Sequence, residues 1–411
     1  MAGNRETSVV RRDAGQASRR DGPRGEYDRW LLLAGVALAC IGIVMVASSS
    51  IAVADAQHVG EFYFLRKHLV FLGGGVTLAW LAARTELRSL EKYALPLLML
   101  SGVLLLLVFL PGVGIRVNGA RRWINLGMIG FQPVEAVKLI FIVYLASYLV
   151  RHRESVEQKL VGLLKPLLIA SGAAVLLLMQ PDFGSAALII AVTVAMVWLG
   201  GVRARFLAGL GLLLLPAAGV LALSQDYRIK RLTSFLDPWK DPFDDGFQLT
   251  QALIAIGRGE WFGVGLGASV QKLFYLPEAH TDFILAVIAE ELGLVGVLVV
   301  LGLYSLLVGR GLWLGMRGVA IGQSLAGYVA SGIAICIGLQ AGVSIGVNLG
   351  VLPTKGLTLP LISSGGSSVL MTCAMVGVLL RASYEITRAG DARQMAVRPS
   401  LSTDAPVEAL P

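Results

Sequence analysis

Long apolar runs recur along almost the whole chain of 411 residues and constrain its fold more than any other feature. A helix needs roughly 20 apolar residues to cross a bilayer core about 30 Å thick. Within hydrocarbon, only helices and closed barrels satisfy every backbone polar group. The sequence therefore predicts an all-α polytopic membrane protein with about ten transmembrane helices, near residues 30–53, 69–84, 93–111, 134–150, 166–181, 185–201, 206–224, 282–308, 319–345 and 367–386.

The composition excludes an ordinary soluble domain. Hydrophobic residues make up 55% of the chain, charged residues 15%, and the mean hydropathy is +0.72. The basic excess would suggest nucleic acid in a soluble protein, but here the charges lie mostly in short loops beside apolar runs, so we expect no nucleic-acid partner. Cys40, Cys336 and Cys373 lie far apart within apolar runs, which predicts neither a metal site nor a disulfide.

Positive charge also predicts the orientation of the chain. If both termini lie in the cytoplasm, most of the 35 Lys and Arg residues fall in segments on the cytoplasmic side of the membrane. Residues 1–29 and 387–411 are expected to be disordered tails around a transmembrane domain at 30–386. The connection at 225–281, between the seventh and eighth spans, then lies outside, and loops of that length are commonly functional or disordered.

Two outer segments carry candidate binding residues. Glu135 and Lys138 are three residues apart on a helix expected to start near Pro133, so their side chains can pair where the helix enters the membrane. Either the two side chains only neutralise each other's charge at the membrane boundary, or they bind a substrate. Arg121, beside Trp123, is either an interfacial anchor or part of a cationic platform for a phosphate-bearing lipid head group.

The segment LPEAHTDFILAVIAEELG, residues 276–293, joins an acidic loop to an apolar helix that carries more carboxylates. Glu290 lies about 12 Å along the helix from Asp282, inside the hydrocarbon, where it must face a partner or a wet cavity. Asp282, at the helix mouth, can stay ionised close to a membrane-bound substrate. Capping of the helix and catalysis both remain open for Asp282. The segment at 352–368, which contains Lys355, is expected to be re-entrant or to line a cavity.

Together these motifs resemble one family, the SEDS proteins (shape, elongation, division and sporulation), which are polytopic bacterial cell-wall glycosyltransferases. The resemblance covers residues 30–386 and rests on NGARRWINLG, QPVEAVKL, QPDFGSA, GFQLTQALIAIGRGEWFGVGLG, QKLFYLPEAHTDFILAVIAEELG and LPTKGLTLPLISSGGSS. PEAHTDFI and LPTKGLTLPLIS are more similar to the division branch than to the elongation branch. Val134, Ala252 and Ser364 depart from the family pattern without removing a charged position.

The resemblance implies that the chain polymerises lipid II into glycan strands on the periplasmic face of the inner membrane, at the division septum. The aspartate in the long loop of the family matches Asp282, and its acidic and basic pair matches Glu135 and Lys138. Arg121, Lys138 or Lys355 would offset the charge of the pyrophosphate, and Glu290 joins them as a substrate-binding candidate. Asp282 is either the general base or the ligand of a divalent cation, Mg²⁺ or Mn²⁺.

The implied partners are a class B penicillin-binding transpeptidase and other divisome proteins. Two functions from other classes compete with polymerisation. Intramembrane charges and broken helices also mark translocation paths, which would suit a flippase for lipid II. A scaffold that recruits the transpeptidase would use its polar residues only for structure. Membership of the elongation branch is the alternative within the family.

Overall fold

Helices dominate the computed structural model, which describes residues 25–117, 119–125, 127, 130–223, 234–240, 242, 246–273, 275–353 and 356–397. Ten helices overlap the ten expected apolar ranges: α2 (Arg29–Ala56), α3 (Tyr63–Arg84), α5 (Ala94–Leu107), α6 (Pro133–Arg151), α8 (Leu160–Met179), α9 (Phe183–Leu199), α10 (Ala204–Leu223), α13 (Ile284–Ala320), α14 (Ser324–Asn348) and α15 (Gly366–Val397). Three short helices join them: α4 (Leu87–Lys92), α7 (Arg153–Gln158) and α12 (Phe247–Gly259).

Within the described residues, six helices are long and apolar enough to cross a membrane, namely α2, α6, α8, α13, α14 and α15. Two shorter apolar helices, α5 and α9, lie among them. This confirms the prediction of a multi-pass membrane protein, whereas the full set of ten spans stays a prediction. Most of the N-terminal tail expected at 1–29 and the last part of the C-terminal tail lie outside the described residues.

The expectation of an all-α chain is wrong in one segment, between α5 and α6. Strands β1 (Gly114–Val117), β2 (Ala120–Asn125) and β3 (Gly130–Phe131) form a small antiparallel sheet in the order β1-β2-β3. Val117 pairs with Ala120, and Gly119 between them has a φ of 79°, a conformation that glycine adopts without strain. The sequence pair Asn118-Gly119 is typical of a hairpin turn, a signal that hydropathy does not register.

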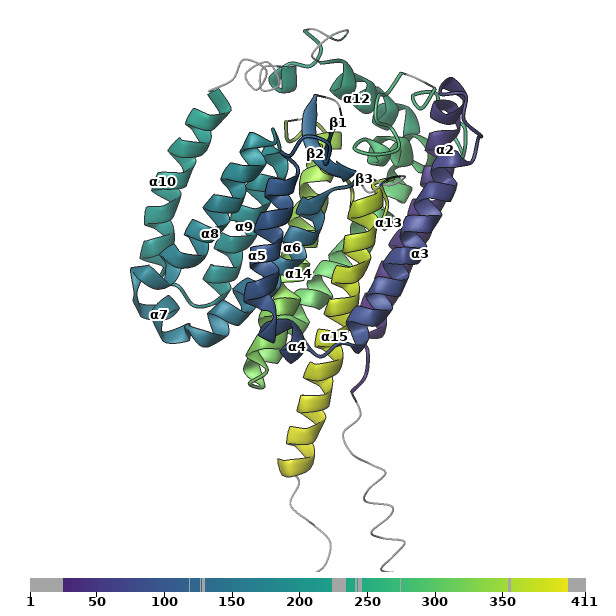
Figure 1. Cartoon of the computed structure of the whole chain (residues 1–411). Helices are drawn as coiled ribbons and strands as arrows, with labels where there is room; N and C mark the ends of the chain where they lie inside the picture. Colours follow the sequence, from purple (N-terminus) through teal and green to yellow (C-terminus); the bar gives the residue numbers. More distant parts are fainter. Residues whose placement is uncertain are drawn as a thin grey trace, which may run out of the picture.

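The sheet and α12 lie at one end of the bundle, and α4 and α7 lie at the other (Figure 1). The described chain begins and ends at the second of these ends, where the tilted rings of Tyr27 and Tyr384 lie with their centroids 5.2 Å apart. Arg310 pairs there with Asp28 at 2.6 Å. The long loop and the two ends of the described chain therefore lie at opposite ends of the bundle.

Two helices are longer than the apolar pattern predicts. Helix α13 continues to Ala320 instead of ending near 308, and α15 continues to Val397, through part of the segment expected as a disordered tail. The extra turns of α15 begin after a pair between Arg381 and Glu385, four residues apart and 2.7 Å from each other. Pairs of this kind support a helix outside the hydrocarbon, where hydropathy no longer marks its end.

Helix α13 is interrupted at Gly293, whose φ of 67° and ψ of −165° are not helical. The loop that follows α12 fills the break and exchanges backbone hydrogen bonds with α13. The bonds run from Leu294 N–H to Glu260 O, Val295 N–H to Trp261 O, Val264 N–H to Glu290 O and Gly265 N–H to Glu291 O, with lengths between 2.9 and 3.1 Å. A Cβ atom at Gly293 would lie 2.4 Å from the Gly263 nitrogen, so only glycine fits there.

Candidate functional site

Asp282 lies directly before α13, at the end of the bundle that carries the sheet and α12, and is partly exposed. The loop that leads into α15 lies against its carboxylate. A Cβ atom built on Gly356 would be only 3.1 Å from Asp282 Oδ2, a distance tighter than most real Cβ contacts. The glycine therefore lets the backbone of this loop approach the carboxylate closely, and the two segments form the walls of the candidate site.

The start of α13 is capped by another helix. Its N-cap position belongs to Phe283, not to Thr281 or Asp282. The side-chain oxygen of Asn348, at the end of α14, accepts a hydrogen bond from Ala286 N–H at 3.1 Å. Asn348 therefore shares in capping α13, and both interpretations of Asp282 stay open.

Hydroxyl groups hold the loop opposite Asp282 in place. Ser363 Oγ donates to the Thr281 carbonyl at 2.6 Å and accepts from Leu359 N–H at 2.8 Å. Thr358 Oγ1 donates to Ser368 Oγ at 2.9 Å. This part of the predicted cavity-lining segment is thus fixed beside the residue that precedes Asp282, while Lys355 lies outside the described residues and its role stays a prediction.

Glu135 and Lys138 pair within the first turns of α6, as their spacing predicts. Lys138 Nζ forms an ion pair with Glu135 Oε2 at 2.8 Å. The lysine also donates a hydrogen bond to Gln340 Oε1 of α14, at 2.6 Å. Both charged side chains are buried, and the cavity beside Lys138 has a volume of about 10 Å³, enough for one water molecule at most. The pair is therefore enclosed among the described residues, and its binding of a substrate stays a prediction.

The two arginines of β2 have different surroundings. Arg122 donates to the carbonyls of Gln180 and Pro181, and so ties the sheet to the turn between α8 and α9. Asp182 in that turn caps α9 by accepting from Ser185 N–H at 3.1 Å. Arg121 Nε is buried and has no hydrogen-bond partner among the described residues. Arg121 therefore has an unsatisfied donor, and its contact with an anionic ligand stays a prediction.

Glu290 is fully buried in α13, but its partners come from the long outer loop. Its carboxylate accepts from the side chains of Arg258, at 3.1 Å, and Ser269, at 2.5 Å. The backbone N–H groups of Val270 and Gln271 donate to it at 3.1 and 3.3 Å. These contacts favour an anchoring role for Glu290 over the substrate-binding role that its position in the sequence suggested.

The neighbouring Glu291 anchors the same loop, a role that the sequence did not suggest. It pairs with Lys272 at 2.7 Å and accepts from the Ser48 hydroxyl of α2 at 2.7 Å. Lys272 Nζ also donates to Ser48 Oγ, at 2.9 Å. Two adjacent carboxylates of α13 therefore fasten residues 258–272 to the bundle.

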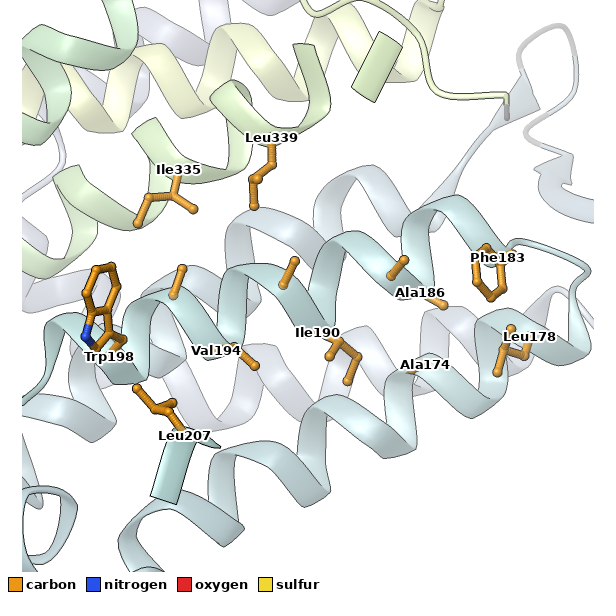
Figure 2. A pocket seen from close by; sticks show the side chains of 13 residues that line it. Ala174, Leu178, Phe183, Ala186, Ile190, Val194, Trp198, Leu207, Ile335 and Leu339 are labelled. Atoms are coloured by element: carbon orange, nitrogen blue, oxygen red, sulfur yellow. The ribbon is translucent and has the colours of Figure 1, made fainter. Parts of the chain in front are cut away.

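An apolar groove of about 630 Å³ runs along α9, with walls from α8, α10 and α14. Phe183 lies at one end and Trp198 at the other, with Ile190 and Val194 between them (Figure 2). Helix α9 has 17 residues, which span about 25 Å. The end at Phe183 adjoins the turn that Arg122 ties to the sheet, so the groove leads toward the end of the bundle that carries Asp282.

The side chains near Asp282 determine whether a divalent cation could bind there. Among the described residues, no group of three or more His, Cys, Asp or Glu side chains gathers at one point. Mg²⁺ is commonly held by one or two carboxylates together with substrate phosphates, and Asp282 suits that arrangement. A cation at Asp282 would therefore take most of its ligands from substrate and water, and its presence stays a prediction.

The helical bundle, the small sheet and the carboxylate just before α13 define a multi-pass membrane protein with a polar site at one end of the bundle. The model of the FtsW, RodA and SpoVE family, described as cell cycle proteins, matches residues 29–388, and the chain belongs to this family. Membership confirms the resemblance drawn from the motifs.

Similar sequences are named as probable peptidoglycan glycosyltransferases FtsW. The relative from Xanthomonas oryzae is 55% identical, over 96% of this chain and 82% of its own length. The relative from Thioalkalivibrio sulfidiphilus is 50% identical, over 89% of this chain and 92% of its own length. These names agree with the division branch predicted from PEAHTDFI and LPTKGLTLPLIS.

Solved structures of related proteins share the fold. A chain of a peptidoglycan synthase complex that coordinates polymerisation and crosslinking has a TM-score of 0.70 and 32% identity, over 88% of this chain and 98% of that one. Thermus thermophilus RodA has a TM-score of 0.62 and 31% identity, over 87% of this chain and 96% of that one. The similarity thus spans the whole membrane domain.

Proposed function

We propose that the chain polymerises lipid II into glycan strands on the outer face of the membrane, with Asp282 as the catalytic carboxylate. By its sequence relatives, the chain is a peptidoglycan glycosyltransferase of the FtsW type, which acts in cell division. The observation that carries the proposed site is the position of Asp282 at the outer mouth of α13, against the close backbone of Gly356. The septum is the proposed location.

The proposed reaction joins two lipid-linked sugars. The 4-hydroxyl oxygen of the acceptor GlcNAc forms a bond to the anomeric carbon of the growing chain. The bond from that carbon to the pyrophosphate oxygen breaks, and its electron pair leaves with undecaprenyl pyrophosphate. Asp282 accepts the hydroxyl proton, and Arg121 supplies a donor for the departing negative charge. A divalent cation held by Asp282 is the alternative, and removal of divalent cations with EDTA distinguishes the two roles.

Of Lys138 and Lys355, both predicted to contact the pyrophosphate, only Lys355 keeps that role in the proposal. Lys138 is buried beside a cavity of about 10 Å³, so the proposal gives it no contact with phosphate. Lys355 directly precedes Gly356 in the sequence and keeps its proposed role.

The apolar groove supports a lipid-linked substrate. Its lining is almost wholly hydrocarbon, and its length along α9 suits part of a long polyprenyl chain. With the prenyl chain in the groove, the pyrophosphate would lie toward the outer end of the bundle, where β2 carries Arg121. A groove of this kind would also suit a flippase, so the product of the reaction must decide between the two functions.

Polymerisation of purified lipid II by the purified chain, together with its class B transpeptidase, tests the proposed function. Glycan strands resolved on a gel are the expected product. A flippase or a scaffold would yield none, so absence of polymer from a folded complex contradicts the proposal. Co-purification of the transpeptidase tests the proposed partner in the same preparation.

Filling the groove should weaken binding of the lipid. Ala191→Trp places an indole in the groove, and loss of about two methylene contacts, at about 0.8 kcal/mol each, corresponds to a rise in KM of roughly tenfold. A lipid II analogue with a short prenyl chain should show no such rise. The control Val175→Trp adds the same side chain to an exposed position of α8 outside the groove. Equal KM values for Ala191→Trp and Val175→Trp would exclude the groove as the prenyl site.

Cysteine labelling tests the orientation and the ten proposed spans. With both termini in the cytoplasm, an impermeant reagent added outside should modify a cysteine placed at Lys240, in the long loop, but not one placed at Ser155, in α7. Each is measured in whole cells and again after permeabilisation. Labelling of Ser155→Cys alone in whole cells would reverse the topology and move the proposed substrate side with it.

A further inference from the structure

Helix α14 carries a stripe of polar side chains that no motif marks. Gln340, Ser344 and Asn348 are four residues apart, so they lie on one face of the helix. All three are buried. Polar side chains at membrane depth are costly unless they find partners, so a stripe of this kind indicates a function in the bundle.

Asn348, at the outer end of the stripe, holds the backbone around Asp282. Its Nδ2 donates to the Asp282 carbonyl at 2.9 Å and to the Ser344 carbonyl at 2.8 Å. Its Oδ1 accepts from Ala286 N–H at 3.1 Å. One amide side chain therefore fixes both the first turn of α13 and the residue that carries the catalytic carboxylate.

Gln340, two turns deeper, holds the opposite wall. Its Oε1 accepts from Lys138 Nζ at 2.6 Å, and its Nε2 donates to the Thr358 carbonyl at 3.0 Å. Because an ammonium group can only donate, Lys138 dictates which end of the amide turns toward Thr358. Thr358 is two residues beyond Gly356, the residue whose backbone lies against the Asp282 carboxylate.

We propose that Gln340 and Asn348 are positioning residues for glycosyl transfer. From one face of α14, Asn348 holds the backbone of Asp282 and Gln340 holds the loop opposite, so the helix sets the gap between the carboxylate and Gly356. The pair of Glu135 and Lys138 acts on the reaction only through the orientation of Gln340. This inference rests on the proposed function, because a positioning role requires that Asp282 performs the chemistry.

The expected effect is on turnover rather than on binding. A displacement of about 1 Å at a reacting group can lower a rate by roughly 10²-fold. Gln340→Met keeps the size of the side chain but removes both hydrogen bonds, so kcat should fall between about tenfold and a hundredfold, while KM for lipid II stays within about threefold of the wild-type value. Unfolding in detergent is measured beside the kinetics.

Gly356→Ala disturbs the same gap from the other side, because the added methyl group would lie 3.1 Å from Asp282 Oδ2. The two changes should therefore be non-additive: the double variant loses less than the product of the two single losses. In an Asp282→Asn background, Gln340→Met should change the remaining polymerisation no further. Thr193→Val is the matched control, since Thr193 is equally buried but its hydroxyl bonds only to Ile189 O of its own helix, at 2.7 Å.

Gln340→Glu covers the case in which Gln340→Met does not fold. The carboxylate still accepts from Lys138 but loses the donor to the Thr358 carbonyl, so kcat should fall here too. Wild-type kcat in a folded Gln340→Met, or in Gln340→Glu if only that variant folds, overturns the inference. Additive losses with Gly356→Ala overturn it as well. Polymer from the wild type and none from Asp282→Asn shows that the proposed function stands whatever the Gln340 variants do.

Discussion

Asp282→Asn is expected to lower lipid II polymerisation by about 10² to 10⁴-fold, the loss typical of a missing general base. Asparagine keeps the size of aspartate and is an equally good helix cap, but it lacks the charge that a base or a cation ligand needs. The variant should still insert, unfold at the wild-type temperature and bind its transpeptidase. Gel analysis of the glycan product, normalised to folded protein, measures the loss.

Glu278→Gln is the matched control for this experiment. Glu278 is an exposed carboxylate of the same loop, and the Thr281 hydroxyl donates to it at 2.6 Å. Because Glu278 is exposed to solvent, its neutralisation should leave polymerisation within about twofold of wild type. If Asp282 only supported the helix start, Asp282→Asn would cost at most about 1 kcal/mol of stability and activity would stay near normal. Abundant polymer from Asp282→Asn would therefore rule out the catalytic role.

Lys138→Ala is expected to be more damaging than Glu135→Ala. Loss of the lysine leaves the Glu135 carboxylate buried without its cation, at a cost of about 3 to 5 kcal/mol. Loss of the glutamate leaves Lys138 with its hydrogen bond to Gln340, so the penalty is smaller. Denaturation of both variants in detergent gives the difference in the free energy of unfolding.

The double variant Glu135→Ala with Lys138→Ala separates stability from activity. With both charges removed, the unpaired-charge penalty disappears, and the protein should be more stable than Lys138→Ala alone. Polymerisation should stay low, because Gln340 loses the donor that orients it. Removal of the exposed pair of Arg153 and Glu157, 2.8 Å apart, is the control and should cost at most about 1 kcal/mol. Normal polymerisation by the double variant would show that the buried pair has a structural role only.

Much of the fold could be predicted because hydropathy reports directly on spans. Hydropathy does not mark the end of a helix that continues beyond the hydrocarbon. The observed ends of α13 and α15 therefore lie beyond the ends that the apolar pattern predicts. Nor does hydropathy mark the outer hairpin, whose signal is the local turn pair Asn118-Gly119. Periodicity and turn chemistry have to be evaluated separately, even in a chain dominated by apolar runs.

The candidate site was predictable only where partners are close in sequence. The spacing of Glu135 and Lys138 predicted their pairing, which is confirmed. Glu290 was assigned to the substrate because its partners, such as Arg258, lie in a loop that spacing rules do not reach. The stripe on α14 did leave a signal, polar residues four apart in an apolar helix, but their partners become visible only in three dimensions.

The break at Gly293 bears on how the chain enters the membrane during synthesis. The segment at 260–265 leaves the ribosome before α13, and backbone groups on both sides of the break bond to it. A helix inserted alone would carry unsatisfied peptide groups into hydrocarbon, each costing several kcal/mol. We therefore expect residues 260–265 and α13 to enter the membrane together, and sequence changes in GEWFGVG to lower the amount of protein that reaches the membrane.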